Sequence, residues 1–94
     1  MNAVFNSVYD EKAFWVSDGI VVHNLYELAF ALGDMKKSIF KKHVNKHKND
    51  FYEWINNTLQ DEELAKKFVR VITKDKAEII VLRHIARKLA EIKE

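Results

Sequence analysis

Apolar and polar residues first form a clear pattern between residues 13 and 24. Two short apolar runs, residues 13–16 and 20–22, flank the dipeptide Asp18-Gly19. This dipeptide favours a type I′ turn, which needs positive φ at both central residues. We therefore expect a β-hairpin here. An isolated two-stranded hairpin is only marginally stable, so its apolar side should pack against helices.

Five segments with helical periodicity follow the hairpin, at residues 25–33, 36–45, 50–59, 61–72 and 76–93. Apolar residues recur in each at spacings of three and four, the pattern of a helix with one buried face. The residues expected on the inward faces are Leu25, Leu28, Ala29, Leu32, Ile39, Phe40, His43, Val44, Phe51, Trp54, Ile55, Leu59, Leu64, Ala65, Phe68, Val69, Ile72, Ala77, Ile80, Val81, Ile85, Leu89 and Ile92. The sequence thus predicts an α+β, mostly α fold.

Its organisation is one domain over residues 1–94, with an N-terminal extension (1–12), the hairpin (13–24) and a bundle of about five helices (25–94). This size is typical of a single domain with one core.

Short polar residues mark the helix ends. Asn24 with Glu27 is expected to cap the first helix, Gly33 to end it, and Asn49 or Asp50 to cap the third. The last helix should begin after Asp75, with Glu78 three residues on. This last helix carries more apolar residues than one buried stripe needs. It is either central in the bundle, the interpretation we favour, or in contact with another protomer.

The composition indicates where in the cell the protein works and argues against a membrane partner. The chain has no Cys, which excludes a disulfide framework and suits a reducing environment. It has no signal-like N-terminus and no apolar run of about 18 residues, so we expect a cytoplasmic protein without a membrane partner.

Charge is unevenly distributed along the chain. Residues 1–35 carry one Lys and five acids, whereas residues 36–48 carry six Lys and no acid. Such a lysine-rich helix could bind phosphates of nucleic acid, or it could be a solvated face. No aromatic-interleaved motif or recognised DNA-reading pattern accompanies it.

His43 and His47 are four residues apart, a spacing known from zinc sites on helices. With Asp50 nearby, a metal-dependent or hydrolytic enzyme is the weakest of three hypotheses. The alternative is structural: His43 packs in the core with one ring nitrogen bonded to backbone, His47 is exposed, and Asn45, Asn49 and Asp50 cap helix ends. No nucleophile with identifiable spacing, small-molecule substrate or cofactor can be recognised.

Blocks between residues 14 and 68 resemble a small family of archaeal and bacterial proteins known as a domain of unknown function. The blocks are His43-Val44-Asn45, Lys48-Asn49-Asp50-Phe51 and Trp54-Ile55. The resemblance implies no activity. A second similarity, of residues 8–10 and 19–24 to the C-terminal block of inteins, is interpreted as coincidence, because splicing needs Cys, Ser or Thr where Leu25 lies.

We therefore expect a non-catalytic protein-interaction or accessory module, with a protein partner or self-association. The main alternative is a nucleic-acid-associated protein that uses the lysine-rich helix 36–48. The candidate interaction surface is Lys37, Lys41, Lys42, His43, Asn45, Lys46, His47, Lys48, Asn49 and Asp50.

Overall fold

A computed structural model describes residues 6–92 of the chain. Over these residues the fold is α+β and mostly α, with five α-helices and two antiparallel strand pairs, so the predicted fold class is confirmed. The elements are β1 (Phe14–Trp15), β2 (Val21–Val22), α1 (Leu25–Asp34), α2 (Lys37–His43), β3 (Val44–Asn45), β4 (Lys48–Asn49), α3 (Asp50–Glu53), α4 (Glu62–Phe68) and α5 (Lys74–Glu91). A 3₁₀ turn (Asp10–Lys12) precedes β1, and a π-helical turn (Trp54–Thr58) continues α3. Residues 1–5 of the predicted extension and Lys93 of the predicted last helix lie outside the described residues.

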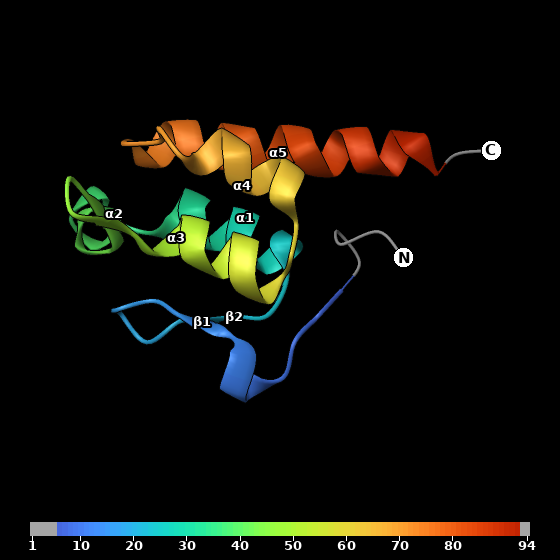
Figure 1. Cartoon of the computed structure of the whole chain (residues 1–94). Helices are drawn as coiled ribbons and strands as arrows, with labels where there is room; N and C mark the ends of the chain where they lie inside the picture. Colours follow the sequence, from blue (N-terminus) through green and yellow to red (C-terminus); the bar gives the residue numbers. More distant parts are fainter. Residues whose placement is uncertain (1–5, 93–94) are drawn as a thin grey trace.

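The α1 and α3 helices lie in the middle of the molecule. In Figure 1, α5 forms one side of the molecule and the β1–β2 hairpin the other, with α1 and α3 between them. The end of α1 meets the start of α5, so the two helices are antiparallel. At this junction Lys74 Nζ of α5 donates to the carbonyl oxygens of Leu32 (2.9 Å) and Gly33 (3.3 Å) of α1. These bonds also satisfy carbonyls that a helix end leaves unpaired.

Aromatic rings fill the centre. The Phe51 ring stacks on Phe14 at 4.7 Å between centroids and on Phe40 at 5.6 Å. Residues whose predicted burial is confirmed are Leu25, Leu28, Ala29, Leu32, Phe40, His43, Val44, Phe51, Trp54, Ile55, Leu59, Leu64, Ala65, Phe68, Ala77, Val81 and Ile85. Ile39 and Ile80 are partly buried against this core.

Burial of Val69 and Ile72 is a wrong prediction, since their exposed fractions are 58% and 74%. The α4 helix ends at Phe68, so the helical periodicity no longer applies beyond it. Val71 is buried instead.

The first hairpin forms at the predicted residues, with Phe14 opposite Val22 and Trp15 opposite Val21. Its turn is different. The Gly19 N–H donates to the Val16 carbonyl at 2.8 Å, and within the turn only Gly19 has positive φ, at +100°. A type I′ turn needs two such residues, so that assignment is wrong. A single glycine at positive φ, reinforced by the Ile20 N–H bond to Asp18 Oδ1 (3.1 Å), closes the loop.

The second helix is shorter than predicted because the chain enters a hairpin that the sequence pattern did not indicate. The α2 helix stops at His43, and β3 then pairs with β4, with Val44 opposite Asn49. In the turn between them Asn45 Oδ1 accepts the His47 N–H at 2.9 Å. Asn45 is therefore a turn residue and not a helix cap.

The helix caps follow the predictions in part. Asn24 caps α1 by accepting the Glu27 N–H at 2.8 Å, and Asn49 caps α3 by accepting the Tyr52 N–H at 3.0 Å. The predicted cap at Asp75 is wrong, since Thr73 Oγ1 accepts the Lys76 N–H (3.2 Å) and α5 begins at Lys74. Gly33 lies within α1 and does not end it.

The predicted central position of α5 is also wrong. Its buried residues Ala77, Val81, His84 and Ile85 form one side, which packs against α1 and α4. The apolar residues on its other side are exposed, with exposed fractions between 40% and 55% for Ile79, Leu82, Leu89 and Ile92. Burial of Leu89 and Ile92 was therefore predicted wrongly. A long helix at the edge of the molecule keeps an uncovered apolar surface.

Candidate interaction surface

The sequence-predicted site residues lie at one end of the molecule but in two different environments. Lys37, Lys41 and Lys42 on α2, and Lys46 in the β3–β4 turn, are exposed. Within residues 6–92 no hydrogen bond or ion pair engages their side chains, whereas Lys48 contacts Asp50 at 3.1 Å. Lys37 and Lys41 also line a hollow where α2 meets the start of α5. The four lysines 37, 41, 42 and 46 are called the lysine surface.

His43 and Asp50, by contrast, belong to the core. His43 has an exposed fraction of 8%, and its ring packs against Phe14 (5.1 Å) and Phe51 (5.6 Å). Its Nε2 accepts the Ser17 N–H at 3.0 Å, so this nitrogen carries no proton. The proton must then sit on Nδ1, which donates to Asp50 Oδ2 at 3.0 Å.

His43 is thus a neutral ring that joins the first hairpin to α3, in agreement with its predicted structural role. His47 is exposed. The two histidines therefore do not form a pair on one helix face.

Sequence reasoning missed a second buried histidine. His84 on α5 is fully buried, and its Nε2 lies 2.7 Å from Oδ2 of Asp61, whose Oδ1 caps α4 by accepting the Leu64 N–H. His84 Nδ1 has no hydrogen-bond partner among the described residues. The neutral tautomer with its proton on Nε2 donates to Asp61 and leaves only Nδ1 as an unpaired acceptor. It costs less than the other tautomer, which would leave the Nδ1 proton unpaired and turn an Nε2 lone pair toward the carboxylate.

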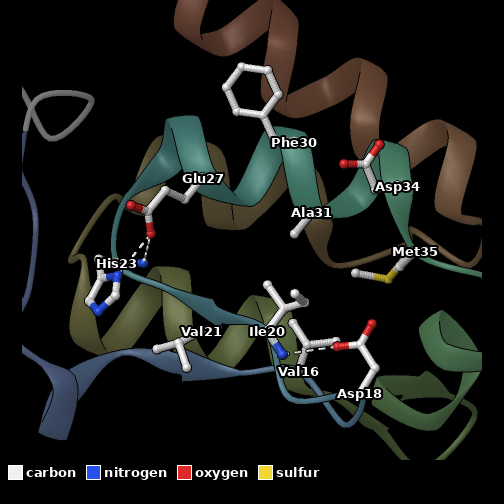
Figure 2. A pocket seen from close by; sticks show the side chains of 10 residues that line it. All are labelled: Val16, Asp18, Ile20, Val21, His23, Glu27, Phe30, Ala31, Asp34 and Met35. Carbon is white, nitrogen blue, oxygen red and sulfur yellow. Dashed lines mark hydrogen bonds and ion pairs between the residues drawn. The ribbon is translucent and has the colours of Figure 1, made fainter.

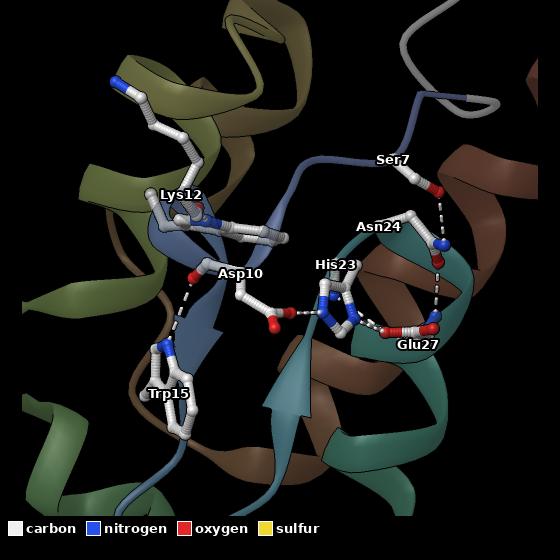
Figure 3. Close-up of polar contacts among 8 residues, drawn as sticks. Ser7, Asp10, Lys12, Trp15, His23, Asn24 and Glu27 are labelled. Atoms are coloured by element: carbon white, nitrogen blue, oxygen red, sulfur yellow. Dashed lines mark hydrogen bonds and ion pairs between the residues drawn. The ribbon is translucent and has the colours of Figure 1, made fainter.

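A third histidine ties the N-terminal segment to α1. His23 Nε2 lies 2.7 Å from Asp10 Oδ1, and Nδ1 lies 2.9 Å from Glu27 Oε1 (Figure 3). Hydrogen bonds to Asp10 and then Glu27 raise the pKa of His23 above its ordinary value of 6.5. The hydrogen bond from the His23 ring lowers the pKa of Glu27. Beside it, Asn24 Nδ2 donates to Ser7 Oγ at 2.9 Å.

An apolar hollow lies between the first hairpin and α1. It encloses about 420 Å³ and is bordered by Ile20 and Val21 of the hairpin and by Ala31 of α1 (Figure 2). The charged and titratable residues that line it are Asp18, His23, Glu27 and Asp34.

A second hollow of similar volume lies on the other side of Phe30, between α1 and α5. It is lined by apolar residues such as Leu82 and by the carboxylates of Asp34 and Glu78. Phe30 projects from α1, borders both hollows and has an exposed fraction of 73%. Among the described residues that line either hollow there is no Lys or Arg. We call the two hollows with Phe30 the acidic–apolar face.

The sequence did contain a signal for this face. Phe30 falls outside the predicted buried stripe of the first helix, between Glu27 and Asp34 on the opposite side. A single exposed apolar residue is common on protein surfaces, so this signal gains meaning only with the apolar hollows on both sides of Phe30. The hollows themselves require the hairpin and α5 to pack beside α1, which no local pattern indicates.

Two features are absent from residues 6–92, a set of metal ligands and a membrane-spanning helix. In this part of the chain no group of three His, Cys, Asp or Glu side chains is placed to hold a metal ion. No helix there combines the length and apolar character needed to cross a bilayer.

Comparison with known proteins identifies no relative. No protein-family model, curated protein or solved structure matches the chain. Membership of the family of unknown function therefore stays a prediction.

Proposed function

We propose that this protein is a non-catalytic interaction module whose acidic–apolar face binds an apolar, positively charged protein segment. The observation that carries the proposal is the composition of the two hollows around Phe30. An exposed aromatic residue beside concave apolar surface is typical of the anchor of a protein contact. Glu27 is paired with His23, but no Lys or Arg borders the carboxylates of either hollow, which favours a partner that brings its own Lys or Arg.

The non-catalytic part of the proposal is supported by the histidines. Both ring nitrogens of His43 are engaged, by the Ser17 N–H and by Asp50, so neither is available to a substrate or a metal without loss of a structural bond. His84 is fully buried. The lack of Cys in the sequence favours a reducing compartment, and we place the module in the cytoplasm.

A titration with three synthetic helical peptides tests the function. The peptides share one leucine pattern at spacings of three and four, and their remaining positions are Lys, Glu or Gln. We expect the Lys peptide to shift backbone amide resonances of α1 and the β1–β2 loop in two-dimensional NMR. The Gln peptide should bind more weakly, and the Glu peptide should leave the resonances unchanged.

Matched variants localise the binding. Phe30→Ser should weaken the Lys peptide at least about tenfold. Ile72→Ser is the control, because Ile72 is exposed to the same degree (74% against 73%) but lies outside the face. If none of the three peptides shifts α1 residues, or if both variants weaken binding equally, the proposed function is wrong.

The lysine surface supports a second candidate function, binding to nucleic acid. Its four exposed lysines have no acidic partner within residues 6–92 and could neutralise phosphates. Titration of the chain into labelled RNA and duplex DNA at about 50 and about 200 mM salt tests this candidate, because phosphate contacts make affinity fall with salt.

A further inference from the structure

The outward side of α1 carries one apolar residue between two acids. Glu27, Phe30 and Asp34 follow one another at steps of three and four, and all are exposed. They lie opposite the buried stripe of α1, formed by Leu25, Leu28, Ala29 and Leu32.

The outward side of α5 carries the same spacing with the opposite charge. Lys76, Ile79 and Arg83 also follow one another at steps of three and four, and all are exposed. They border a hollow of about 550 Å³ whose charged lining residues are all basic. No ion pair within residues 6–92 engages Lys76 or Arg83. The two antiparallel helices thus offer two stripes that are complementary to each other.

The two stripes are also in register. Because α1 and α5 are antiparallel, residues that meet across their seam define common levels along the helices. The Glu78 carboxylate lies over Gly33, at 2.8 Å from the position that a Cβ would take there, and Phe30 shares a hollow with Leu82. Asp34 is therefore level with the segment around Glu78, only about 3 Å along the axis from Lys76.

The same count places the second acid. Six residues before Gly33 on α1 correspond to six residues after Glu78 on α5, so Glu27 is level with His84 and Ile85. That level lies between Arg83 and Arg87. A rotation about an axis parallel to the helices does not change these levels.

We propose that a second copy of this chain docks on this face as an isologous dimer, with a two-fold axis parallel to the seam between α1 and α5. The proposal rests on the proposed function and names its partner. Each α1 lies over the α5 of the other copy, Phe30 packs on Ile79 and Leu82, Asp34 pairs with Lys76, and Glu27 pairs with the arginines. An isologous contact must be self-complementary, and here every charge contact is made twice.

This occupant is favoured over an unrelated basic segment by two observations. The stripe on α5 has the composition that the acidic–apolar face requires, and it lies beside that face at the matching level. The dimer also covers the exposed Ile79 and Leu82, so it accounts for part of the excess apolar surface of α5. A face made by α1 and the part of α5 beside it is at the small end of stable interfaces, so we expect a dissociation constant of roughly 1–100 µM.

Reciprocal charge exchange tests the dimer. In an Asp34→Lys homodimer, both contacts between positions 34 and 76 join two lysines. In a Lys76→Glu homodimer, both contacts join two acids. Each variant alone should therefore dimerise at least about tenfold more weakly than wild type.

An equimolar mixture of the two variants should restore dimers to within about threefold of the wild-type affinity. In the mixed dimer, the lysine introduced at position 34 of one chain faces the glutamate introduced at position 76 of the other. The second contact keeps the natural Asp34 and Lys76. Both contacts are then attractive, so recovery in the mixture is specific to this pairing.

Both substitutions suit their helices. Asp34→Lys places a cation at the end of α1, and Lys76→Glu places an acid in the first turn of α5, so each agrees with the helix dipole and should fold. The controls are Glu11→Lys and Lys37→Glu, which change charge equally at exposed positions off this face. Their dimerisation should stay within about threefold of wild type.

Sedimentation velocity at about 5 to 500 µM protein and about 50 mM salt measures these dissociation constants, because surface charge pairs are least screened at low salt. A chain that stays monomeric throughout, or a dimer that the two exchanges leave unchanged, would overturn the proposed dimer. The proposed function is decided separately. If the monomeric chain still shows α1 shifts with the Lys peptide, the face binds a different basic segment and only the second copy is excluded as its occupant.

Discussion

Trp54 joins the π-helical turn to the N-terminal segment, and its removal should destabilise the core strongly. Its exposed fraction is 7%, its ring meets Phe14 edge-on at 5.9 Å, and its indole N–H donates to the Lys12 carbonyl at 2.8 Å. Trp54→Ala removes the packing and the bond, which should cost about 3–5 kcal/mol. For a domain of this size that corresponds to a fall in Tm of about 12–40 °C. Trp54→Phe keeps most of the ring but leaves the Lys12 carbonyl without its donor, at a cost of about 1–3 kcal/mol.

Urea and thermal unfolding followed by circular dichroism measure both variants. Trp15→Ala is the internal control, because the chain's other tryptophan has an exposed fraction of 59% and makes only a 3.3 Å bond to the Asp10 carbonyl. It should cost less than about 1 kcal/mol. Equal losses for Trp54→Ala and Trp15→Ala would refute the reasoning, since burial would then not determine the cost.

The histidine tie, the hairpin turn and the lysine surface each give a further testable expectation. Because the pKa of His23 is raised in the folded state, its bonds stabilise the fold fully below about pH 6.5 and lose that effect as pH rises through the folded-state pKa. The stability difference between wild type and His23→Gln should therefore shrink from about pH 5.5 to about pH 8.5, and a difference that grows over this range would contradict the expectation. Gly19→Val should lower the free energy of unfolding in urea by about 1–3 kcal/mol because φ at Gly19 is +100°, even though no atom lies within 4 Å of an added Cβ. Gly33→Ala should cost less, because the added Cβ meets only the flexible Glu78 side chain. If the lysine surface binds phosphates, replacing three of its lysines by Gln should weaken binding to RNA and to duplex DNA equally. The slope of log affinity against log salt should become shallower by about two to three, with the stability of the fold unchanged. Absence of wild-type binding at about 50 mM salt would exclude this function. The three positions are Lys41, Lys42 and Lys46.

The helices that the sequence predicted best are those with an unbroken apolar stripe. Leu25, Leu28 and Leu32 are buried as expected because spacings of three and four hold from cap to end of α1. The β3–β4 pair could not be predicted, since each strand has two residues and the stretch is rich in polar side chains.

The candidate site divides in the same way. The structural interpretation of His43 agrees with its bonds, because a histidine on an apolar stripe must find backbone or carboxylate partners when it is buried. His84 was missed because its partner Asp61 is 23 residues away in the sequence, and an acid at a helix start needs no partner beyond the cap that Asp61 also makes with the Leu64 N–H. The acidic–apolar face required a third element, α5, to be placed beside α1.

The spatial separation of charge decides how the two candidate functions can be told apart. The acids Asp18, Glu27 and Asp34 lie around the hollow between the hairpin and α1, whereas the exposed lysines Lys41 and Lys42 lie on α2. These acids line a hollow that the four lysines do not border, so the two sets of side chains form separate contact surfaces. A substitution at Asp34 should change protein binding without changing nucleic-acid affinity by more than its small effect on net charge. Lysine replacements on α2 should do the reverse, so a variant that abolishes both kinds of binding would indicate loss of the fold and not loss of a surface.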